Sequence, residues 1–316
     1  MIARRTLLKG ATMAALAATT TGLSLRPGGA QVVPYSAGTD PPKLKAPPNA
    51  CDCHMHIYNS RFAAAPGVGP HPVDARAQDY RLFQKRIGTT RNVIVTPSTY
   101  GTDNSCTLDA LATLGTTARA IAVVDTSVTD AELKRLAGLG VRGMRFMLNP
   151  SSPTTVAMLE PLAKRVNDLG WHVQISTSAR QIIAIEDLLM RLPIPVMFDH
   201  FAHPGQPAGI EDPVFAVVRR LIDKGRTWVK LSAPYIDSKI GPPSYADVTP
   251  VAQAYVKAAP ERLVWASDWP HPSQGDNHPD DAVLFDLLTQ WIPDAATRNR
   301  ILVQNAETFY GFGKPA

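Results

Sequence analysis

Short apolar segments alternate with helix-like segments along almost the whole chain from Ala50 onward, and this alternation constrains the fold most. Eight apolar runs have the length and composition of buried strands: Ala50–His56, Asn92–Pro97, Ala120–Val124, Gly143–Leu148, His172–Ile175, Pro195–Asp199, Trp228–Leu231 and Leu263–Ala266. Between them, apolar residues recur at the three- and four-residue spacing of helices, as at Ala131–Leu139, Val156–Leu169, Gln181–Leu192, Val214–Lys224, Pro250–Ala259 and Asp281–Trp291. Eight strand–helix units predict an α/β fold of a single domain, a closed parallel (β/α)8 barrel of the TIM type.

Polar side chains gather where the predicted strands end. In a barrel of this kind the active site lies at the C-terminal ends of the strands, so these side chains are expected to meet. They are His54 and His56, Ser98 and Tyr100, Arg145, Gln174 and Ser176, Asp199, His200 and His203, Lys230, Ser232 and Tyr235, and Ser267, Asp268 and His271.

The segment Asp52-Cys-His54-Met-His56 carries the strongest chemical signal. Residues two apart in a strand face the same side, so the two imidazoles should project together and either hold a metal or polarise a carbonyl group. Asp268 follows the last apolar run, where a carboxylate can act as the general base toward water. With His200, these residues form the predicted catalytic set. The structural alternatives are histidines bonded to backbone and an aspartate that caps the next helix.

Arg145 ends the fourth predicted strand, and a guanidinium in a barrel mouth suits a substrate carboxylate through paired hydrogen bonds. Asp199 directly precedes His200 and is therefore expected to point the other way. The other predicted substrate-binding residues are Ser98, Tyr100, Gln174, His203, Tyr235 and His271.

The N-terminus resembles an export signal. Arg4 and Arg5 precede Leu-Leu-Lys, and an apolar stretch without acidic residues ends at small residues near Ala30. This pattern predicts a twin-arginine signal peptide over 1–30 and a periplasmic location, with a general secretion signal or an uncleaved anchor as the alternatives. Residues 31–49, rich in Pro and Gly, are expected to form an extended arm, and residues 50–314 the barrel.

The charge of the chain depends largely on that signal. Removing residues 1–30 removes four basic residues and no acidic one, which lowers the formal net charge from +5 to +1. The remaining chain has no basic patch that would indicate nucleic-acid binding, and no apolar run long enough to span a membrane. The oligomeric state stays open, a homo-oligomer included.

Taken together, the motifs resemble the amidohydrolase superfamily, and within it the amidohydrolase-2 group that contains the 2-pyrone-4,6-dicarboxylate lactonases and D-galactarolactone isomerase. The resemblance extends from Ala50 to Phe312. It is carried by Asp52-Cys-His-Met-His56, Ser98-Thr-Tyr-Gly-Thr-Asp-Asn104, Gly140-Val-Arg-Gly-Met-Arg-Phe146, Asp199-His200, Trp228-Val-Lys-Leu-Ser232, Ser267-Asp-Trp-Pro-His271 and Asn305-Ala-Glu-Thr-Phe-Tyr310.

Two departures from the family pattern bear on the chemistry. Metal-bearing members of the superfamily usually add a histidine at the end of the fifth strand, where this chain has Gln174 or Ser176. The lactonases that the chain resembles require no metal, so no cofactor is expected; the alternative is one Zn²⁺ on His54, His56, His200 and Asp268. In the dicarboxylate lactonases an arginine follows the sixth-strand histidine by three residues, where this chain has His203.

The resemblance implies a hydrolase that opens a small carboxylated lactone. Asp268 would activate water, while His54, His56 and His200 would polarise the ring carbonyl. The alternatives are a lactone isomerase, a decarboxylase of the same group, and a periplasmic binding protein without catalytic activity.

Overall fold

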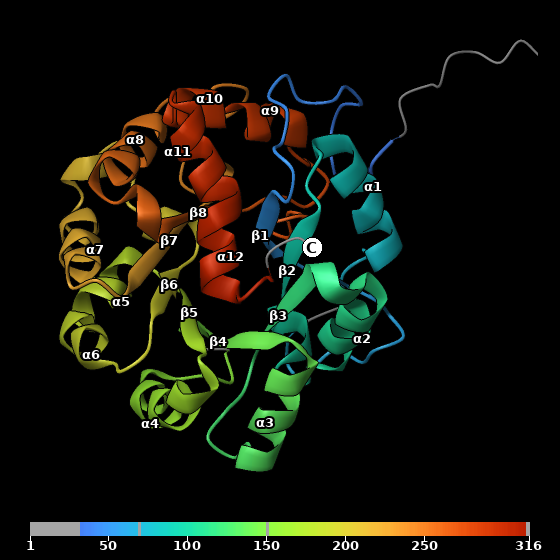
Figure 1. Cartoon of the computed structure of the whole chain (residues 1–316), viewed down its shortest axis with the longest axis vertical. Coiled ribbons are helices and arrows are strands. Elements are labelled where there is room, and N and C mark those ends of the chain that lie inside the picture. The colour runs from blue at the N-terminus through green and yellow to red at the C-terminus, as the bar shows by residue number, and fades with distance from the viewer. Residues whose placement is uncertain (1–31, 69–70, 150–151, 314–316) are drawn as a thin grey trace, which may run out of the picture. The chain divides into compact units, whose positions relative to one another are not determined.

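The computed structural model describes residues 32–68, 71–149 and 152–313, and eight parallel strands run side by side there in chain order. They are β1 (Cys51–Met55), β2 (Arg91–Val95), β3 (Ala118–Ala122), β4 (Val141–Met147), β5 (His172–Ser176), β6 (Val196–Phe198), β7 (Thr227–Leu231) and β8 (Leu263–Trp265). Helices surround the strands, as Figure 1 shows. The predicted (β/α)8 barrel is confirmed.

The described helices follow the predicted alternation with some differences. Their bounds are α1 (Ala77–Ile87), α2 (Ser105–Leu114), α3 (Asp130–Leu139), α4 (Val156–Val166), α5 (Ala179–Ala184), α6 (Glu186–Arg191), α7 (Pro213–Asp223), α8 (Thr249–Ala258), α9 (Asp281–Asp286), α10 (Leu288–Trp291), α11 (Ala295–Asn299) and α12 (Asn305–Tyr310). α1 and α2 are not among the predicted helices. The segments predicted as single helices over 181–192 and 281–291 are each divided in two. At Ile185 the division arises because the backbone leaves helical geometry, with φ −112° and ψ 15°.

Side chains of each strand alternate between the barrel interior and the helix layer, as the pleat of a strand requires. On β2, Val93 and Val95 belong to an interior apolar cluster, whereas Ile94 packs with the residues of the helix layer. Tyr310 and Phe312, at the end of α12, belong to the same interior cluster. α12 therefore closes the end of the barrel that faces the viewer in Figure 1, and the mouth lies at the other end.

Between Asp52 and Met55, β1 contains one residue more than the matching part of β2, and His54 lies within this segment. Asp52 pairs with Asn92, but Met55 pairs with Ile94, so three steps on β1 match two steps on β2. Such a bulge interrupts the alternation of side chains and re-aims the residues that follow it. As a result His54 faces the barrel interior, although Cys51 and Cys53 also belong to the interior cluster.

The seam between β8 and β1 closes through the residues that follow β8. The N–H of Asp268 donates to the carbonyl of His54 at 2.9 Å, and the N–H of His56 donates to the carbonyl of Trp269 at 2.8 Å. Below these bonds, the buried carboxylate of Asp52 accepts from several donors across the seam. They are the Ser267 N–H (2.9 Å) and hydroxyl (2.5 Å), the His54 N–H (3.2 Å) and the Tyr80 hydroxyl (3.0 Å).

Part of the segment predicted as an extended arm packs against the barrel at this seam. The indole N–H of Trp269 donates to the carbonyl of Pro34 at 2.9 Å, and the Tyr35 ring meets the Trp269 ring edge-on at 5.8 Å between centroids. The predicted signal peptide over residues 1–30 lies outside the described residues. Within the described part, no helix combines the length and the apolar character needed to cross a membrane.

We predict that Asp52→Asn removes a component of the pH dependence of stability. Burial raises the pKa of Asp52 to about 6, against the opposing effect of its hydrogen bonds from Ser267, His54 and Tyr80. A raised pKa means that the folded protein holds a proton that the unfolded chain releases, so this contribution is present at low pH and is lost as the pH rises through 6. Between pH 8 and pH 5 the wild type should gain about 1.4 kcal/mol of unfolding free energy relative to the variant. Urea denaturation at both pH values measures this difference, and parallel pH profiles of the two proteins would contradict the assignment.

Candidate active site

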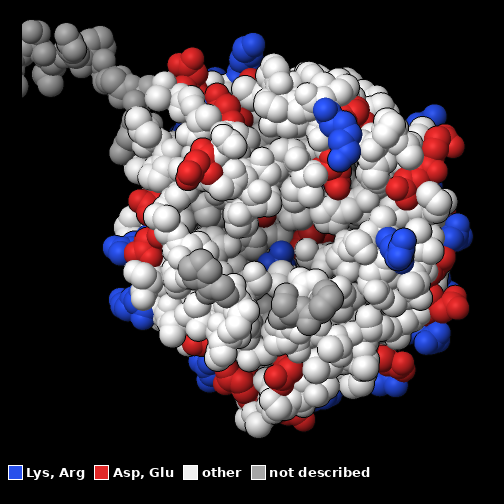
Figure 2. All heavy atoms as spheres, turned by 180° about the vertical axis from the view of Figure 1, so that it is seen from behind, with Lys and Arg blue, Asp and Glu red and all other residues white. Residues whose placement is uncertain are grey.

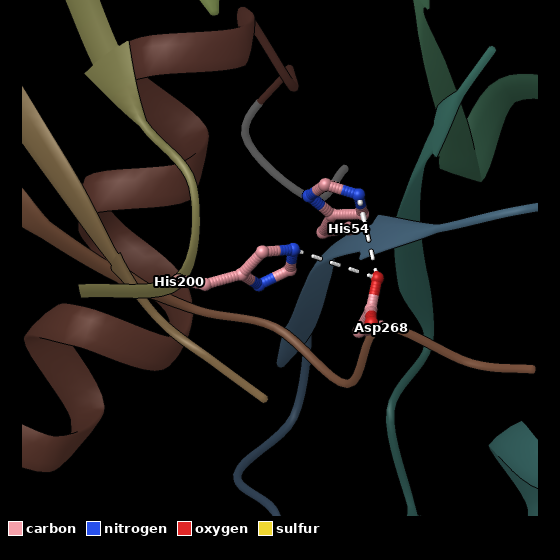
Figure 3. A group of neighbouring side chains, drawn as sticks. All are labelled: His54, His200 and Asp268. Carbon is pink, nitrogen blue, oxygen red and sulfur yellow. Dashed lines mark ion pairs between the residues drawn. The ribbon is translucent and has the colours of Figure 1, made fainter. Parts of the chain in front are cut away.

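Three imidazoles converge on one oxygen of Asp268 inside the mouth of the barrel. Oδ1 of Asp268 lies 3.6 Å from Nε2 of His54, 3.5 Å from Nε2 of His56 and 3.8 Å from Nε2 of His200. The Nε2 atoms of His54 and His56 are 3.1 Å apart. Figure 3 shows how His54 and His200 approach Asp268 from different sides. The structure therefore brings the predicted catalytic set together in one buried group.

His200 owes its position to an unusual turn after β6. His200, Phe201, Ala202 and His203 all have positive φ angles, between 47° and 62°, which build a left-handed turn from residues that carry a Cβ. Each such residue costs on the order of 1–2 kcal/mol relative to ordinary backbone. Strain of this size is concentrated at functional sites, where the surrounding structure enforces it.

The remaining ring nitrogen of each histidine is held by a different partner. Nδ1 of His56 donates to the carbonyl of Val95 at 2.7 Å, which leaves Nε2 as an acceptor in the neutral ring. Nδ1 of His200 lies 2.9 Å from the hydroxyl of Ser232. Nδ1 of His54 lies 3.1 Å from both Nζ of Lys230 and Oδ1 of Asp199. These contacts fix the orientation of the rings.

Asp199 does not point away from the site, and the expectation based on alternation was wrong. Its carboxylate lies in the barrel interior beneath His54, on the same side of the chain as Met197, and the left-handed turn that begins at His200 brings the imidazole to the site as well. The Asp199 carboxylate is 3.2 Å from Nζ of Lys230, 3.1 Å from Nε2 of Gln174 and 3.6 Å from a guanidinium nitrogen of Arg145. Burial alone would raise the pKa of Asp199, but Lys230, His54 and Arg145 hold it well below its usual range.

Lys230 is fully buried; it was predicted to lie among the strand-end side chains, but no catalytic or binding role was assigned to it. The signal was present in the sequence, because Lys230 stands inside an apolar strand two residues before Ser232 and so shares its side of β7. Charges are rarely buried in a strand without a partner. Burial lowers the pKa of Lys230, while Asp199 opposes this shift.

The second oxygen of Asp268 is also occupied. The Tyr235 hydroxyl donates to Oδ2 of Asp268 at 2.9 Å and lies 2.9 Å from Nδ1 of His271. Nε2 of His271 is in turn 3.1 Å from Oδ2 of Asp281, the first residue of α9. Tyr235 and His271 were predicted to contact substrate, but Tyr235 is bonded to the predicted base, and the ring of His271 is bonded to Tyr235 and Asp281.

The electrostatics keep the base ionised. Burial alone would raise the pKa of Asp268, but the imidazoles of His200, His56 and His54 lower it below its usual value. Burial lowers the pKa of His200 to about 4, and burial together with Lys230 lowers the pKa of His54 well below its usual value. At neutral pH the site therefore holds a carboxylate beside neutral His54 and His200, as a general base requires.

The other predicted substrate-binding residues differ in how far they are buried below the mouth of the barrel. Arg145 is 5% exposed, and its guanidinium donates to the carbonyl of Thr96 at 3.2 Å. Gln174 is fully buried, and its side-chain amide donates to the Asp199 carboxylate. Ser98 is exposed, whereas the Tyr100 hydroxyl bonds with the loop residues Asn59 and His71. None of these placements tests whether the residues contact substrate, so that assignment stays a prediction.

His203 lines a cavity beside the imidazole group. The cavity has a volume of about 620 Å³ and is bordered by Leu148, Asn149, Ser176, Thr177, Ser178, Ala179, His203 and Asp237. The ring of His203 is 5.7 Å from that of His200, and its Nδ1 is 3.1 Å from Oδ2 of Asp237. Figure 2 shows the hollow on this face, with basic and acidic atoms visible at its floor.

The donor set also suits one divalent cation. Ligand atoms of His54, His200 and Asp268 lie within 4.8 Å of one another, and Nε2 of His56 borders the same space. Three imidazoles and a carboxylate are a usual zinc donor set. Nδ1 of His54 lies 3.1 Å from both the Lys230 ammonium, which favours this nitrogen as an acceptor, and the Asp199 carboxylate, which favours it as a donor. When Nδ1 donates to Asp199, Nε2 carries no hydrogen and is available to a cation.

Comparison with known proteins defines the family. The chain matches the amidohydrolase family model (Amidohydro_2) over residues 51–312. It is 35% identical to the 2-pyrone-4,6-dicarboxylate hydrolase of Comamonas testosteroni, over 87% of this chain and 94% of that protein. It is 30% identical to the D-galactarolactone isomerase of Agrobacterium fabrum, over 85% of this chain and 93% of that protein.

A solved structure agrees with these matches. The apo crystal structure of ATU3138 from Agrobacterium tumefaciens superposes with a TM-score of 0.80 at 30% identity, covering 89% of this chain and 99% of that one. The chain therefore belongs to the amidohydrolase family, and the prediction of a hydrolytic enzyme of this family is confirmed.

Proposed function

We propose that this protein hydrolyses a small carboxylated lactone. The observation that carries the proposal is the convergence of the three Nε2 atoms of His54, His56 and His200 on one oxygen of an ionised Asp268. A lactone carbonyl is already electrophilic, so its hydrolysis mainly requires an activated water molecule and stabilisation of the oxyanion. The relatives named for a pyrone dicarboxylate and a galactarolactone support the same substrate class.

The steps follow from the geometry of the site. Asp268 takes a proton from water as the water oxygen bonds to the ring carbonyl carbon. In the tautomers proposed for this step, Nδ1 of His54 accepts from Lys230 and Nδ1 of His200 accepts from Ser232, so that both rings carry their hydrogen on Nε2 and stabilise the negative charge on the former carbonyl oxygen. The tetrahedral intermediate collapses, the bond from carbon to the ring oxygen breaks, and Asp268 returns its proton to that oxygen. The product is a hydroxy acid, whose new carboxyl group releases a proton at neutral pH.

Arg145 anchors the carboxylate of the substrate in this proposal. Its Nε atom is buried and has no hydrogen-bond partner among the described residues, so donor capacity remains for a ligand. Ser98, Tyr100, Gln174 and His203 are the other proposed contacts. The cavity beside His203 gives the body of the lactone room next to the imidazoles.

Lactone isomerisation is the second candidate function, favoured by the 30% identity to D-galactarolactone isomerase. There a hydroxyl group of the substrate replaces water as the nucleophile, and Asp268 would take its proton in the same way. Product analysis separates the two reactions, because hydrolysis releases a proton and isomerisation does not.

The role of Asp268 leads to a prediction about turnover. Asp268→Asn keeps the size of the side chain but lacks a useful proton acceptor, so kcat should fall about 10²-fold or more. Arg145→Ala should raise KM more than it lowers kcat, because it removes substrate binding and leaves the base in place. Steady-state kinetics of both variants on any lactone that the enzyme opens measure these effects.

The matched control for this prediction is Asp125→Asn. Asp125 follows β3 at the same end of the barrel and bonds with Ser127 of its own loop, so this variant should turn over normally. Near-normal kcat in Asp268→Asn would remove Asp268 from the mechanism and move the base to a histidine.

We further propose that turnover requires no metal. Gln174 and Ser176, where metal-bearing relatives have a histidine at the end of the fifth strand, support this proposal. If a cation were bound, His54, His56, His200 and Asp268 would hold it, and it would polarise the carbonyl. We predict that kcat survives dialysis against a strong chelator, with metal content measured by atomic emission on the same sample. Stoichiometric zinc whose removal abolishes turnover would refute the prediction.

We also propose export by the twin-arginine route, on the strength of the Arg4–Arg5 pair. Replacing both residues with Lys keeps the charge but alters the pair that the export machinery recognises. The variant precursor should accumulate in the cytoplasm, as measured by fractionation and immunoblotting. A variant with Lys9→Arg serves as the control and should be exported normally. Undiminished periplasmic delivery of the double variant would exclude this route.

A further inference from the structure

A chain of side chains behind Asp268 connects the base to the start of α9. Oδ2 of Asp268 accepts from Tyr235, Tyr235 contacts Nδ1 of His271, and Nε2 of His271 contacts Asp281. The successive distances are 2.9, 2.9 and 3.1 Å. His271 and Asp281 are buried, at 0% and 2% exposure. The chain reaches Asp268 through Oδ2, whereas the imidazoles lie nearest to Oδ1.

The hydrogen count along this chain fixes its direction. An ionised Asp268 carries no hydrogen, so the Tyr235 hydroxyl must donate to it. Nδ1 of His271 must then donate to the Tyr235 oxygen, and Nε2 must donate to Asp281. Both ring nitrogens of His271 carry hydrogen in this arrangement, and the adjacent Asp281 carboxylate stabilises that form.

Both polar ends of His271 are therefore used inside the protein, and the same holds for the hydrogen of Tyr235. Because these hydrogens already form hydrogen bonds within the protein, neither side chain has a free donor for a substrate. We infer that Tyr235, His271 and Asp281 are positioning residues, which lock the Asp268 carboxylate so that Oδ1 faces the imidazoles and the attacking water. This inference rests on the proposed role of Asp268 as the general base.

The backbone supports the same conclusion. Asp268 and His271 have φ angles of 63° and 60°, and the N–H of His271 donates to the carbonyl of Asp268 at 2.7 Å. The tight turn between them brings the His271 ring back toward the base, and the two rings of Tyr235 and His271 pack edge to face at 5.5 Å between centroids. Tyr235 follows β7 and His271 follows β8, so the chain also links the segments that follow these two neighbouring strands.

The test compares two Tyr→Phe variants, each of which removes a tyrosine hydroxyl that donates to a buried carboxylate. Tyr235→Phe removes the donor to Asp268, and Tyr80→Phe removes the donor to the structural carboxylate Asp52. Tyr235→Phe should lower kcat about 10-fold or more with KM within about twofold, the scale expected for one hydrogen bond to a charged group. Tyr80→Phe should lower the Tm and leave kcat within about twofold. A raised KM with unchanged kcat in Tyr235→Phe would overturn the inference and return Tyr235 to substrate binding.

A double-variant cycle tests whether the residues act as one chain. Asp281→Asn should lower kcat in the wild-type background but add little in the Tyr235→Phe background, because its effect passes through the tyrosine hydroxyl. Equal effects of Asp281→Asn in both backgrounds would contradict the chain.

A crystal structure of Tyr235→Phe gives a readout that needs no activity. We expect the Asp268 carboxylate to leave its single orientation in the variant, so that Oδ1 no longer faces all three imidazoles. An unchanged Asp268 would overturn the inference even if kcat falls. If the wild type opens no lactone, the proposed function has failed, and the orientation of Asp268 still decides the positioning role.

Discussion

The rest of the site depends on the closure of the barrel between β8 and β1. The backbone bonds that join Asp268 to His54, and His56 to Trp269, are also the bonds that place the base beside two of its imidazoles. The buried Asp52 carboxylate crosses the same seam and collects donors from both sides. Fold stability and active-site geometry therefore share one small group of interactions, and a change that opens the seam separates the base from the histidines.

Beneath the imidazoles, the barrel interior holds charges that would be costly if they stood alone. Asp199 balances Lys230 and Arg145, and Gln174 supplies a further donor. Breaking such a group by removing one partner leaves an uncompensated buried charge, whereas the complete group is tolerated. This layer gives His54 a rigid support, because both Lys230 and Asp199 hold its Nδ1 atom while Nε2 faces Asp268.

The sequence was sufficient to predict the barrel, the strand ends and the convergence of His54, His56, His200 and Asp268, because these follow from periodicity and from the polarity of strand ends. It was not sufficient where the backbone departs from a regular strand. The bulge in β1 lets His54 face the interior beside Cys53. The left-handed turn after β6 breaks the period of two at His200, so Asp199 and His200 both face the site and the direction of Asp199 was predicted wrongly. The bonds of Tyr235 with Asp268 and with His271 depend on loop geometry, which no periodic pattern encodes.

The left-handed turn that begins at His200 also bears on how this site can change in evolution. Residues three apart in such a turn lie on the same side, which is why His200 and His203 both reach the mouth. Substitution at position 203 can alter the wall of the cavity while His200 stays in place. Insertion or deletion of one residue would instead rotate position 203 away by about a third of a turn. We therefore expect relatives with different substrates to differ by substitutions in this loop, while the length of the loop stays the same.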